Sequence, residues 1–352
     1  MPTRLSRAAV AGAALLVVAC GARPAADGAD GKDLAAGQAL IEQGDYAGAA
    51  EVFAALSTAS PEDPELHYYL GLSRQGLGDD ATAAAEYRRA IELDGSLLEA
   101  RSNLGVLLLG EGDLAAAEAE LRKCVEIDPE DGDSRYNLGL VLDEAGRADE
   151  ARAELAKAAD LLPEDPAPVL ALADLARREG DRDAALAQYE LAKTRAPGEP
   201  AVAIAYGRFL FEIKRADDAV AALRALLDME AADAATLATG GLLLAKAGRD
   251  ADAAELYRAA IAKDAQYARA HVLLANALAR EKRWAEAAAE FEAYLAAAPD
   301  AEDAEAARQG LATCRKHAPA PKPEERADAG AEEKPEPKPE AKTVAEKKPI
   351  AP

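Results

Sequence analysis

The middle of the chain repeats one pattern of small, apolar and polar positions every 34 residues, without insertion or deletion. The first column of this pattern is small in every period, at Gly37, Gly71, Gly105, Gly139, Ala173, Gly207, Gly241 and Ala275. A second column is always alanine, at Ala49, Ala83, Ala117, Ala151, Ala185, Ala219, Ala253 and Ala287. A third is bulky and apolar, at Phe53, Tyr87, Leu121, Leu155, Tyr189, Leu223, Tyr257 and Phe291. Periods of about 20–50 residues are typical of arrays in which each unit packs on its neighbours.

Each period predicts two helices separated by a short turn. A glycine, which tolerates the left-handed backbone at a helix end, lies between them in six units, at Gly44, Gly78, Gly112, Gly146, Gly180 and Gly248. A proline, which cannot continue a helix, closes five units, at Pro61, Pro129, Pro163, Pro197 and Pro299. Small residues let the paired helices approach closely, and the bulky column fills the space left between neighbours.

These columns resemble the tetratricopeptide repeat family over residues 30–301. The resemblance implies an all-α fold, a right-handed solenoid of eight 34-residue helix–turn–helix repeats. Residues 302–317 are polar and out of register, so we expect a helix that caps the last apolar face. Lys214 and Lys282 replace the inter-helix glycine, and Tyr206 and Gly240 replace the usual leucine of the first helix. We therefore expect the loosest packing in the sixth and seventh units.

The N-terminus reads as an export signal. Arg4 and Arg7 precede an apolar stretch that is too short to span a bilayer, and this stretch ends in Val17-Val18-Ala19-Cys20. The ending resembles a bacterial lipoprotein signal, which implies cleavage after residue 19 and a lipid on Cys20. An ordinary secretory signal with an incidental cysteine is the alternative. No acidic residue follows Cys20, which in lipoproteins favours the outer membrane, and we expect a periplasm-facing protein of the cell envelope.

Two further segments differ from the repeats in composition. Residues 20–29 are rich in Ala, Gly and Asp and are expected to form a flexible tether. Residues 318–352 are almost wholly Ala, Pro, Lys and Glu, so they lack the apolar bulk needed for a packed core. We expect a disordered tail, which either reaches a partner or only solubilises the protein.

Composition and motifs argue against nucleic-acid binding, catalysis and bound metals or cofactors. The net charge of −23 disfavours nucleic acid, because a polyanion repels phosphate. The chain has only three cysteines and three histidines, and it holds no phosphate-binding loop, zinc helix or nucleophile elbow. We therefore expect that the protein is not an enzyme and that it binds no cofactor and no metal. Cys124 is expected to be a small buried thiol, and His67 and His271, in equivalent columns, are expected to pack between paired helices.

The resemblance also indicates where a partner would bind, since in this family the first helices line a concave groove. The matching columns predict a contact surface of Tyr68, Leu72, Val106, Leu109, Tyr136, Leu140, Arg177, Arg208 and Phe211. Packing between neighbouring first helices is the alternative role for the aliphatic residues, and ion pairs with nearby carboxylates are the alternative for the arginines. The carboxylate clamp of some family members needs a lysine where this chain has Val272, so that function is not carried over.

The sequence therefore predicts a lipid-anchored scaffold or adaptor for protein–protein interaction or complex assembly in the bacterial envelope. Its expected partners are envelope proteins in the groove and a membrane through the lipid. One alternative is a pilotin-like assembly factor for a type IV pilus or secretion secretin; accessory lipoproteins of the outer-membrane barrel assembly machine share the same features. Another is an adaptor that recruits or regulates a cell-wall enzyme. Homo-oligomerisation through the sixth and seventh units is a third.

Overall fold

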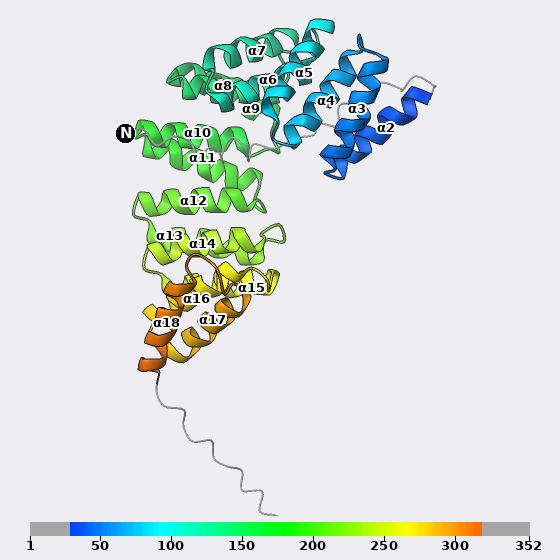
Figure 1. Ribbon diagram of the computed structural model, residues 1–352. Coiled ribbons are helices and arrows are strands. Elements are labelled where there is room, and N and C mark those ends of the chain that lie inside the picture. The colour runs from blue at the N-terminus through cyan, green and yellow to red at the C-terminus, as the bar shows by residue number, and fades with distance from the viewer. Residues whose placement is uncertain (1–28, 319–352) are drawn as a thin grey trace, which may run out of the picture.

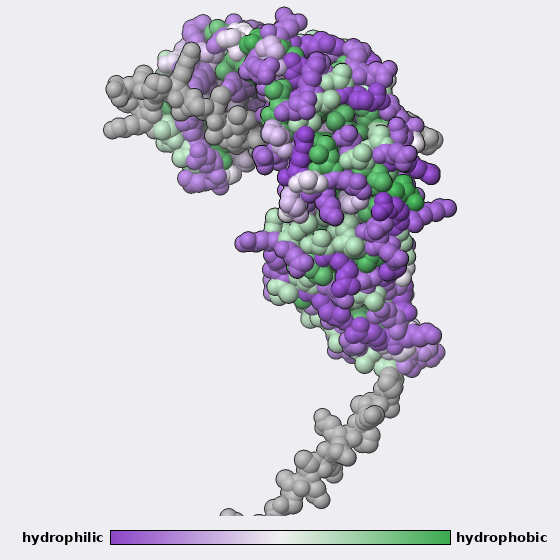
Figure 2. Space-filling model, turned by 180° about the vertical axis from the view of Figure 1, so that it is seen from behind, coloured by the Kyte–Doolittle hydropathy of each residue, from purple (hydrophilic) through white to green (hydrophobic). Residues whose placement is uncertain are grey.

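The computed structural model describes residues 29–318. The predicted export signal, the lipidated Cys20, almost all of the tether and nearly the whole tail lie outside the described residues. Within them the chain forms seventeen α-helices, one short 3-10 helix and no strand. The expected all-α solenoid is confirmed, because the helices stack in chain order along a curved, elongated path (Figures 1 and 2).

Sixteen of these helices form antiparallel pairs, one pair for each period of the sequence. The first helices are α2 (Ala29–Glu42), α4 (Pro64–Gly76), α6 (Leu98–Glu111), α8 (Gly132–Glu144), α10 (Ala167–Glu179), α12 (Pro200–Glu212), α14 (Ala234–Lys246) and α16 (Ala268–Arg280). The second helices are α3 (Tyr46–Ala59), α5 (Asp80–Leu93), α7 (Leu114–Ile127), α9 (Ala148–Leu161), α11 (Arg182–Arg195), α13 (Ala216–Arg224), α15 (Asp250–Lys263) and α17 (Trp284–Ala297).

The three periodic columns form the thin core between these helices. Every member of the alanine column is fully buried, and every member of the bulky column is at most 3% exposed. The small column faces the bulky column of the same unit. A Cβ placed on Gly139, for example, would lie 2.7 Å from the Leu155 side chain. The spacing therefore fixes which side chains meet, because the bulky residue occupies the volume that a larger first-helix residue would need.

The inter-helix turns have the left-handed backbone that the sequence predicted. All six inter-helix glycines have positive φ, between 75° and 86°. Lys214 and Lys282, the two replacements, adopt the same conformation with φ of 66° and 61°. A residue with a Cβ is strained there, so the turn geometry follows from the helix pair and not from the residue.

The sixth unit departs from the others at the end of its second helix. Helix α13 ends at Arg224, a 3-10 turn, η1 (Ala225–Asp228), follows, and its Leu226 is buried. Gly240 on α14 makes room for that side chain, because a Cβ there would lie 2.6 Å from Leu226. Packing between adjacent helices is sparsest from α11 to α12 and from α13 to α14. The expectation of loose packing is confirmed for the sixth unit and is wrong for the seventh, whose helices α14 and α15 form one of the most closely packed pairs.

A polar side chain joins the two helices of the second, third and fourth units. Arg135 on α8 donates to Glu154 on α9 at 2.6 Å and to the carbonyl of Pro129, in the preceding closing turn, at 2.7 Å. Arg101 bonds Glu120 and the Gly95 carbonyl in the same way. We call this arrangement the polar staple; it connects three chain segments at one point.

Histidine takes the arginine's place in the second unit. His67 Nδ1 lies 2.7 Å from Glu86, and its Nε2 lies 3.1 Å from the Pro61 carbonyl. In the eighth unit His271 contacts Glu290 at 2.6 Å. The two histidines do lie between paired helices as expected, but they act there through hydrogen bonds to carboxylates, which the sequence alone had not indicated.

The array ends in the expected capping helix, α18 (Ala304–His317). Ala304, Ala307 and Cys314 are buried, while the side chains on the opposite face, such as Arg308 and Lys316, are exposed. Gly310 lies against Phe291 of α17, where a Cβ would come within 2.6 Å of the ring. The helix therefore covers the last apolar face and presents a polar one.

Candidate functional site: the first-helix surface

The first helices form the inner face of the curved array. Successive first helices contact one another, for example α6 with α8 and α12 with α14, more often than successive second helices do. In a bent stack the inner face is the one on which neighbours lie closest. The residues predicted to line a groove all belong to first helices, and we call the exposed side of these helices the first-helix surface.

The N-terminal part of this surface is aromatic. Tyr68 on α4 is half-buried, and its ring lies 5.0 Å from that of Tyr69 and 6.1 Å from that of Tyr87. Leu72, one turn further along α4, is only 5% exposed and packs in the core around Phe53. Leu72 is therefore a correction to the predicted contact surface, because its neighbours leave almost none of it for a partner.

The next two units continue the surface with apolar side chains. Tyr136 on α8 is half-buried, and burial together with the nearby Asp165 raises its pKa to about 12. Its phenol therefore stays neutral and able to donate a hydrogen bond at any ordinary pH. Val106 and Leu109 on α6 and Leu140 on α8 are also partly exposed. This part of the surface combines apolar contact area with one hydroxyl group, a combination that is favoured at protein interfaces.

The arginines in the middle of the array have different roles. Arg177 pairs with Asp174 at 3.1 Å and with Glu212 at 3.4 Å, so the alternative of ion pairing holds for it. Arg178, beside it, bonds Asp143 of the preceding unit. Arg208 on α12 is exposed and forms no ion pair or hydrogen bond with the residues that the structure describes. The sequence alone could not show which of these three arginines form ion pairs within the protein.

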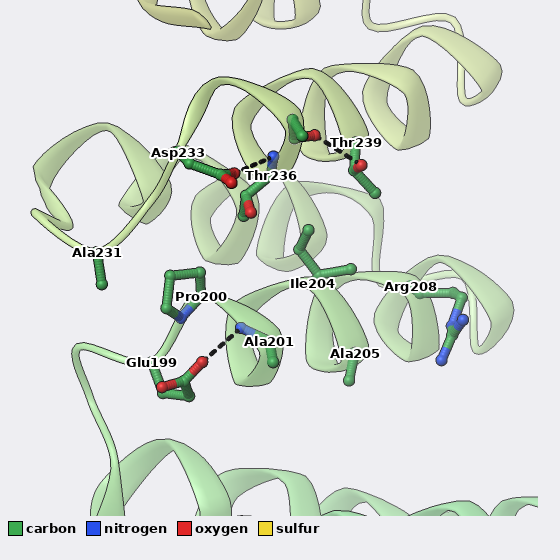
Figure 3. Close-up of a pocket in the computed structure, with 11 residues that line it drawn as sticks. Glu199, Pro200, Ala201, Ile204, Ala205, Arg208, Ala231, Asp233, Thr236 and Thr239 are labelled. Carbon is green, nitrogen blue, oxygen red and sulfur yellow. Dashed lines mark hydrogen bonds between the residues drawn. The ribbon is translucent and has the colours of Figure 1, made fainter. Parts of the chain in front are cut away.

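A hollow of about 480 Å³ opens between α12 and α14, beside Arg208 (Figure 3). Its floor is made of small side chains, including Ala201, Ala205 and Ala235, and Ile204 points from α12 toward α14. Ala231, which replaces the proline that closes most units, lines its edge. The hollow thus coincides with the irregular sixth unit. Phe211, one turn beyond it, is half-buried against the neighbouring core clusters.

Two carboxylates stand at the other end of the hollow from Arg208. Glu199 accepts a hydrogen bond from the backbone N–H of Ala201 at 3.3 Å, and Asp233 accepts one from Thr236 at 2.7 Å (Figure 3). Each therefore caps the start of its helix. Hydrogen bonding to Thr236 lowers the pKa of Asp233, so that carboxylate is ionised at neutral pH. The hollow is negative at one end and positive at the other.

The two cysteine thiols that the structure describes are buried. Cys124 is fully buried, as expected, and burial raises the pKa of its thiol to about 11. Cys314 is also buried, and neither of these two thiols forms a disulfide. Within residues 29–318, no group of three or more His, Cys, Asp or Glu side chains is placed to hold a metal ion. No helix in the same range has the length and apolarity that crossing a membrane requires.

Comparison with protein families gives one consistent match. Two models described as tetratricopeptide repeat match the chain, one over residues 34–97, 73–131 and 239–302 and the other over 108–175. Together these stretches cover more than half of the chain, and neither model matches residues 176–238. That all eight helix pairs are repeats of this family therefore remains a prediction for the fifth and sixth units.

Solved structures with the same arrangement of helices include yeast Tom70 and a tetratricopeptide repeat protein from Parabacteroides merdae. Tom70 is similar with a TM-score of 0.59 at 21% identity, over 83% of this chain and 64% of its own. The bacterial protein is similar with a TM-score of 0.53 at 16% identity, over 71% of this chain and 98% of its own. The chain therefore spans less than two thirds of Tom70, and such identities show the fold alone. No curated protein matches.

Proposed function

The chain belongs to the tetratricopeptide repeat family, and from this premise we propose that it is a lipid-anchored scaffold that binds another envelope protein on its first-helix surface. The observation that carries the proposal is the line of partly exposed aromatic and aliphatic side chains along successive first helices, from Tyr68 through Tyr136 to Phe211. Large amphipathic side chains held by a rigid array provide contact area at little conformational cost.

The membrane part of the proposal rests on the sequence around Cys20. A small residue before the cysteine, an apolar stretch and two leading arginines together support processing as a lipoprotein. Acyl chains contribute about 0.8 kcal/mol for each buried methylene group, so more than one chain gives a stable anchor. An outer-membrane position, facing the periplasm, is the localisation that the residues after Cys20 favour.

Changing Cys20 to alanine tests the anchor. We expect the Cys20→Ala protein to leave the membrane fraction or to accumulate as an uncleaved precursor, whereas a Cys124→Ala control stays on the membrane. The measurement is fractionation of the envelope with immunodetection of the precursor and mature sizes. Normal processing and unchanged membrane association of Cys20→Ala would show that the lipoprotein proposal is wrong.

A crosslinked pull-down from detergent-solubilised envelope tests the binding surface. The Tyr68→Ala/Tyr136→Ala variant is expected to lose a complex that the natural protein recovers, while the Leu77→Ala/Leu191→Ala control keeps it. Leu77 and Leu191 are exposed apolar residues outside the first helices, at a turn and on α11. Circular dichroism establishes that each variant keeps its helices. Equal recovery by all three proteins would remove the first-helix surface as the binding site.

The recovered partner also separates the specific roles. Secretin subunits would support a pilotin-like assembly factor, and a peptidoglycan hydrolase or synthase would support an adaptor for a cell-wall enzyme. Light scattering on the chain without residues 1–20 measures self-association, which would point to an assembly built from copies of this chain.

A further inference from the structure

We propose that the hollow between α12 and α14 binds an extended segment of the partner protein by seating one acidic side chain on Arg208. Small or apolar residues of that segment would lie on the alanine floor, and a basic residue would face Glu199 and Asp233. This inference rests on the proposed function, since it names the kind of sequence that the first-helix surface recognises.

The charge of Arg208 is available to a ligand. In a chain of net charge −23, the neighbouring cations Arg177 and Arg178 are engaged by carboxylates of the protein itself. Arg208 is exposed, lines the hollow, and forms no ion pair with the described residues. A guanidinium offers a planar set of donors that matches the two oxygens of a carboxylate. An acidic group is therefore the ligand that this position favours.

The hollow opens at the surface between two neighbouring helices and has a volume of about 480 Å³. A helical ligand is about 10–12 Å across with its side chains, and those side chains keep its backbone away from the surface on which it lies. Ala201, Ala205 and Ala235 allow a backbone to approach closely because they project only a methyl group. An extended segment with small side chains fits these dimensions.

The opposite charges at the two ends of the hollow are separated along α12. Arg208 follows Glu199 by nine residues on the same helix, which at about 1.5 Å per residue corresponds to about 13 Å. An extended chain covers that distance in about four residues at about 3.3 Å each. Glu199 and Asp233 line the end of the hollow away from Arg208, where their carboxylates cap the starts of α12 and α14. The recognised segment therefore carries opposite charges about four residues apart.

Paired synthetic peptides test the proposal on the full-length protein in detergent. Each pair has the same random flanking residues and differs only in a central Glu or Gln, and a second set adds a Lys or Gln four residues away on either side. Peptides that bind on an array are then measured by fluorescence anisotropy. The variants are Arg208→Gln and Arg208→Glu, with Arg182→Gln as the matched control, because Arg182 is exposed on α11 away from the hollow.

The natural protein and the Arg182→Gln variant should bind each Glu peptide about tenfold more tightly than the matching Gln peptide. The Arg208→Gln variant should lose most of this preference. The added lysine should strengthen binding on one side only. Arg208→Glu should disfavour the Glu peptides. An unchanged preference in Arg208→Gln, or no preference in the natural protein, overturns the inference.

The Tyr68→Ala/Tyr136→Ala variant separates this inference from the proposed function. If peptides bind in a way that depends on the tyrosines but not on Arg208, the first-helix surface remains the binding site and only the inference fails. If no peptide binds and the envelope pull-down is also unaffected by the tyrosines, both fail. Ala235→Phe, which fills the hollow from an exposed position, should weaken the Glu peptides as strongly as Arg208→Gln does.

Discussion

In the second to fourth units, α4 to α9, a polar staple joins the paired helices. From α10 to α15, the two positions that correspond to Arg135 and Glu154 are nearly all apolar. The fifth unit has Val169 and Gln188, the sixth Ala203 and Ala222, and the seventh Leu237 and Leu256. The helix pairs nevertheless form in both regions. The three periodic columns are thus sufficient for pairing, and the staple is an added link to the preceding closing turn.

The two regions also offer different surfaces. The stapled region presents half-buried tyrosines and aliphatic residues, and its helices pack closely. The apolar region contains the shortened α13, the sparse helix junctions and the hollow beside Arg208. Small residues in the core of the sixth unit leave room that the regular units fill. The charged, accessible site is therefore found where the regular packing of the helices is lost.

Removing one half of a staple should have the largest effect. Arg135→Leu leaves Glu154, whose side chain is only 17% exposed, with the exposed Lys157 at 3.2 Å as its remaining ion partner, and should lower the free energy of unfolding by about 2 kcal/mol. Arg135→Leu/Glu154→Leu imitates the seventh unit and should recover most of the loss. Urea unfolding followed by circular dichroism measures both. A single variant as stable as the double variant would show that the staple does not link the helices energetically.

Hydrogen exchange should separate the regions without any substitution. Amides of α13 and of residues 225–228 should exchange about tenfold faster than those of α9, the corresponding second helix of the stapled region. The reason is the sparse packing at both junctions of the sixth unit. Mass spectrometry of exchanged peptides gives the rates, and equal protection of α9 and α13 would contradict the comparison.

Relieving the strained turn of the sixth unit should have a smaller, opposite effect. Lys214→Gly places a glycine where φ is 66° and should raise the free energy of unfolding by about 1 kcal/mol. Gly146→Ala, at the equivalent turn of the fourth unit with φ of 75°, should lower it by a similar amount. Thermal unfolding measures both, and a destabilised Lys214→Gly would mean that the lysine side chain contributes more than the strain.

Exchanging the two kinds of staple should have the smallest effect. His67→Arg introduces the residue of the third and fourth units into the second, and should change the free energy of unfolding by less than about 0.5 kcal/mol. His67→Leu serves as the control and should lower stability more, because Glu86 loses its partner. If His67→Arg is as damaging as His67→Leu, the geometry of the second unit is specific for an imidazole.

Much of the fold could be predicted because it depends on local spacing. Gly37 and Phe53 lie sixteen residues apart, as do Gly241 and Tyr257, and in both cases the two residues meet in the folded unit. The left-handed turns were predicted from glycine, and the cap from the polar segment before His317. The polar staple was missed because its partners lie nineteen residues apart and its acceptor is a backbone carbonyl, which leaves no mark in side-chain patterns.

The sequence defined the predicted contact surface less well than it defined the fold. The column rule placed Leu72, Arg177 and Arg208 on the first-helix surface alike, although Leu72 is buried and Arg177 is held in ion pairs, whereas Arg208 forms none with the described residues. Those outcomes depend on neighbours contributed by other units, such as Glu212 beside Arg177.

By itself the sequence determined the period, the pairing of helices and the members of the thin core, because these follow from contacts within one unit or between adjacent units. Only the tertiary structure decided which surface side chains are used internally and where a hollow opens. Both depend on the exact separation of neighbouring helices, and that separation is set by the combined volumes of side chains from three units at once.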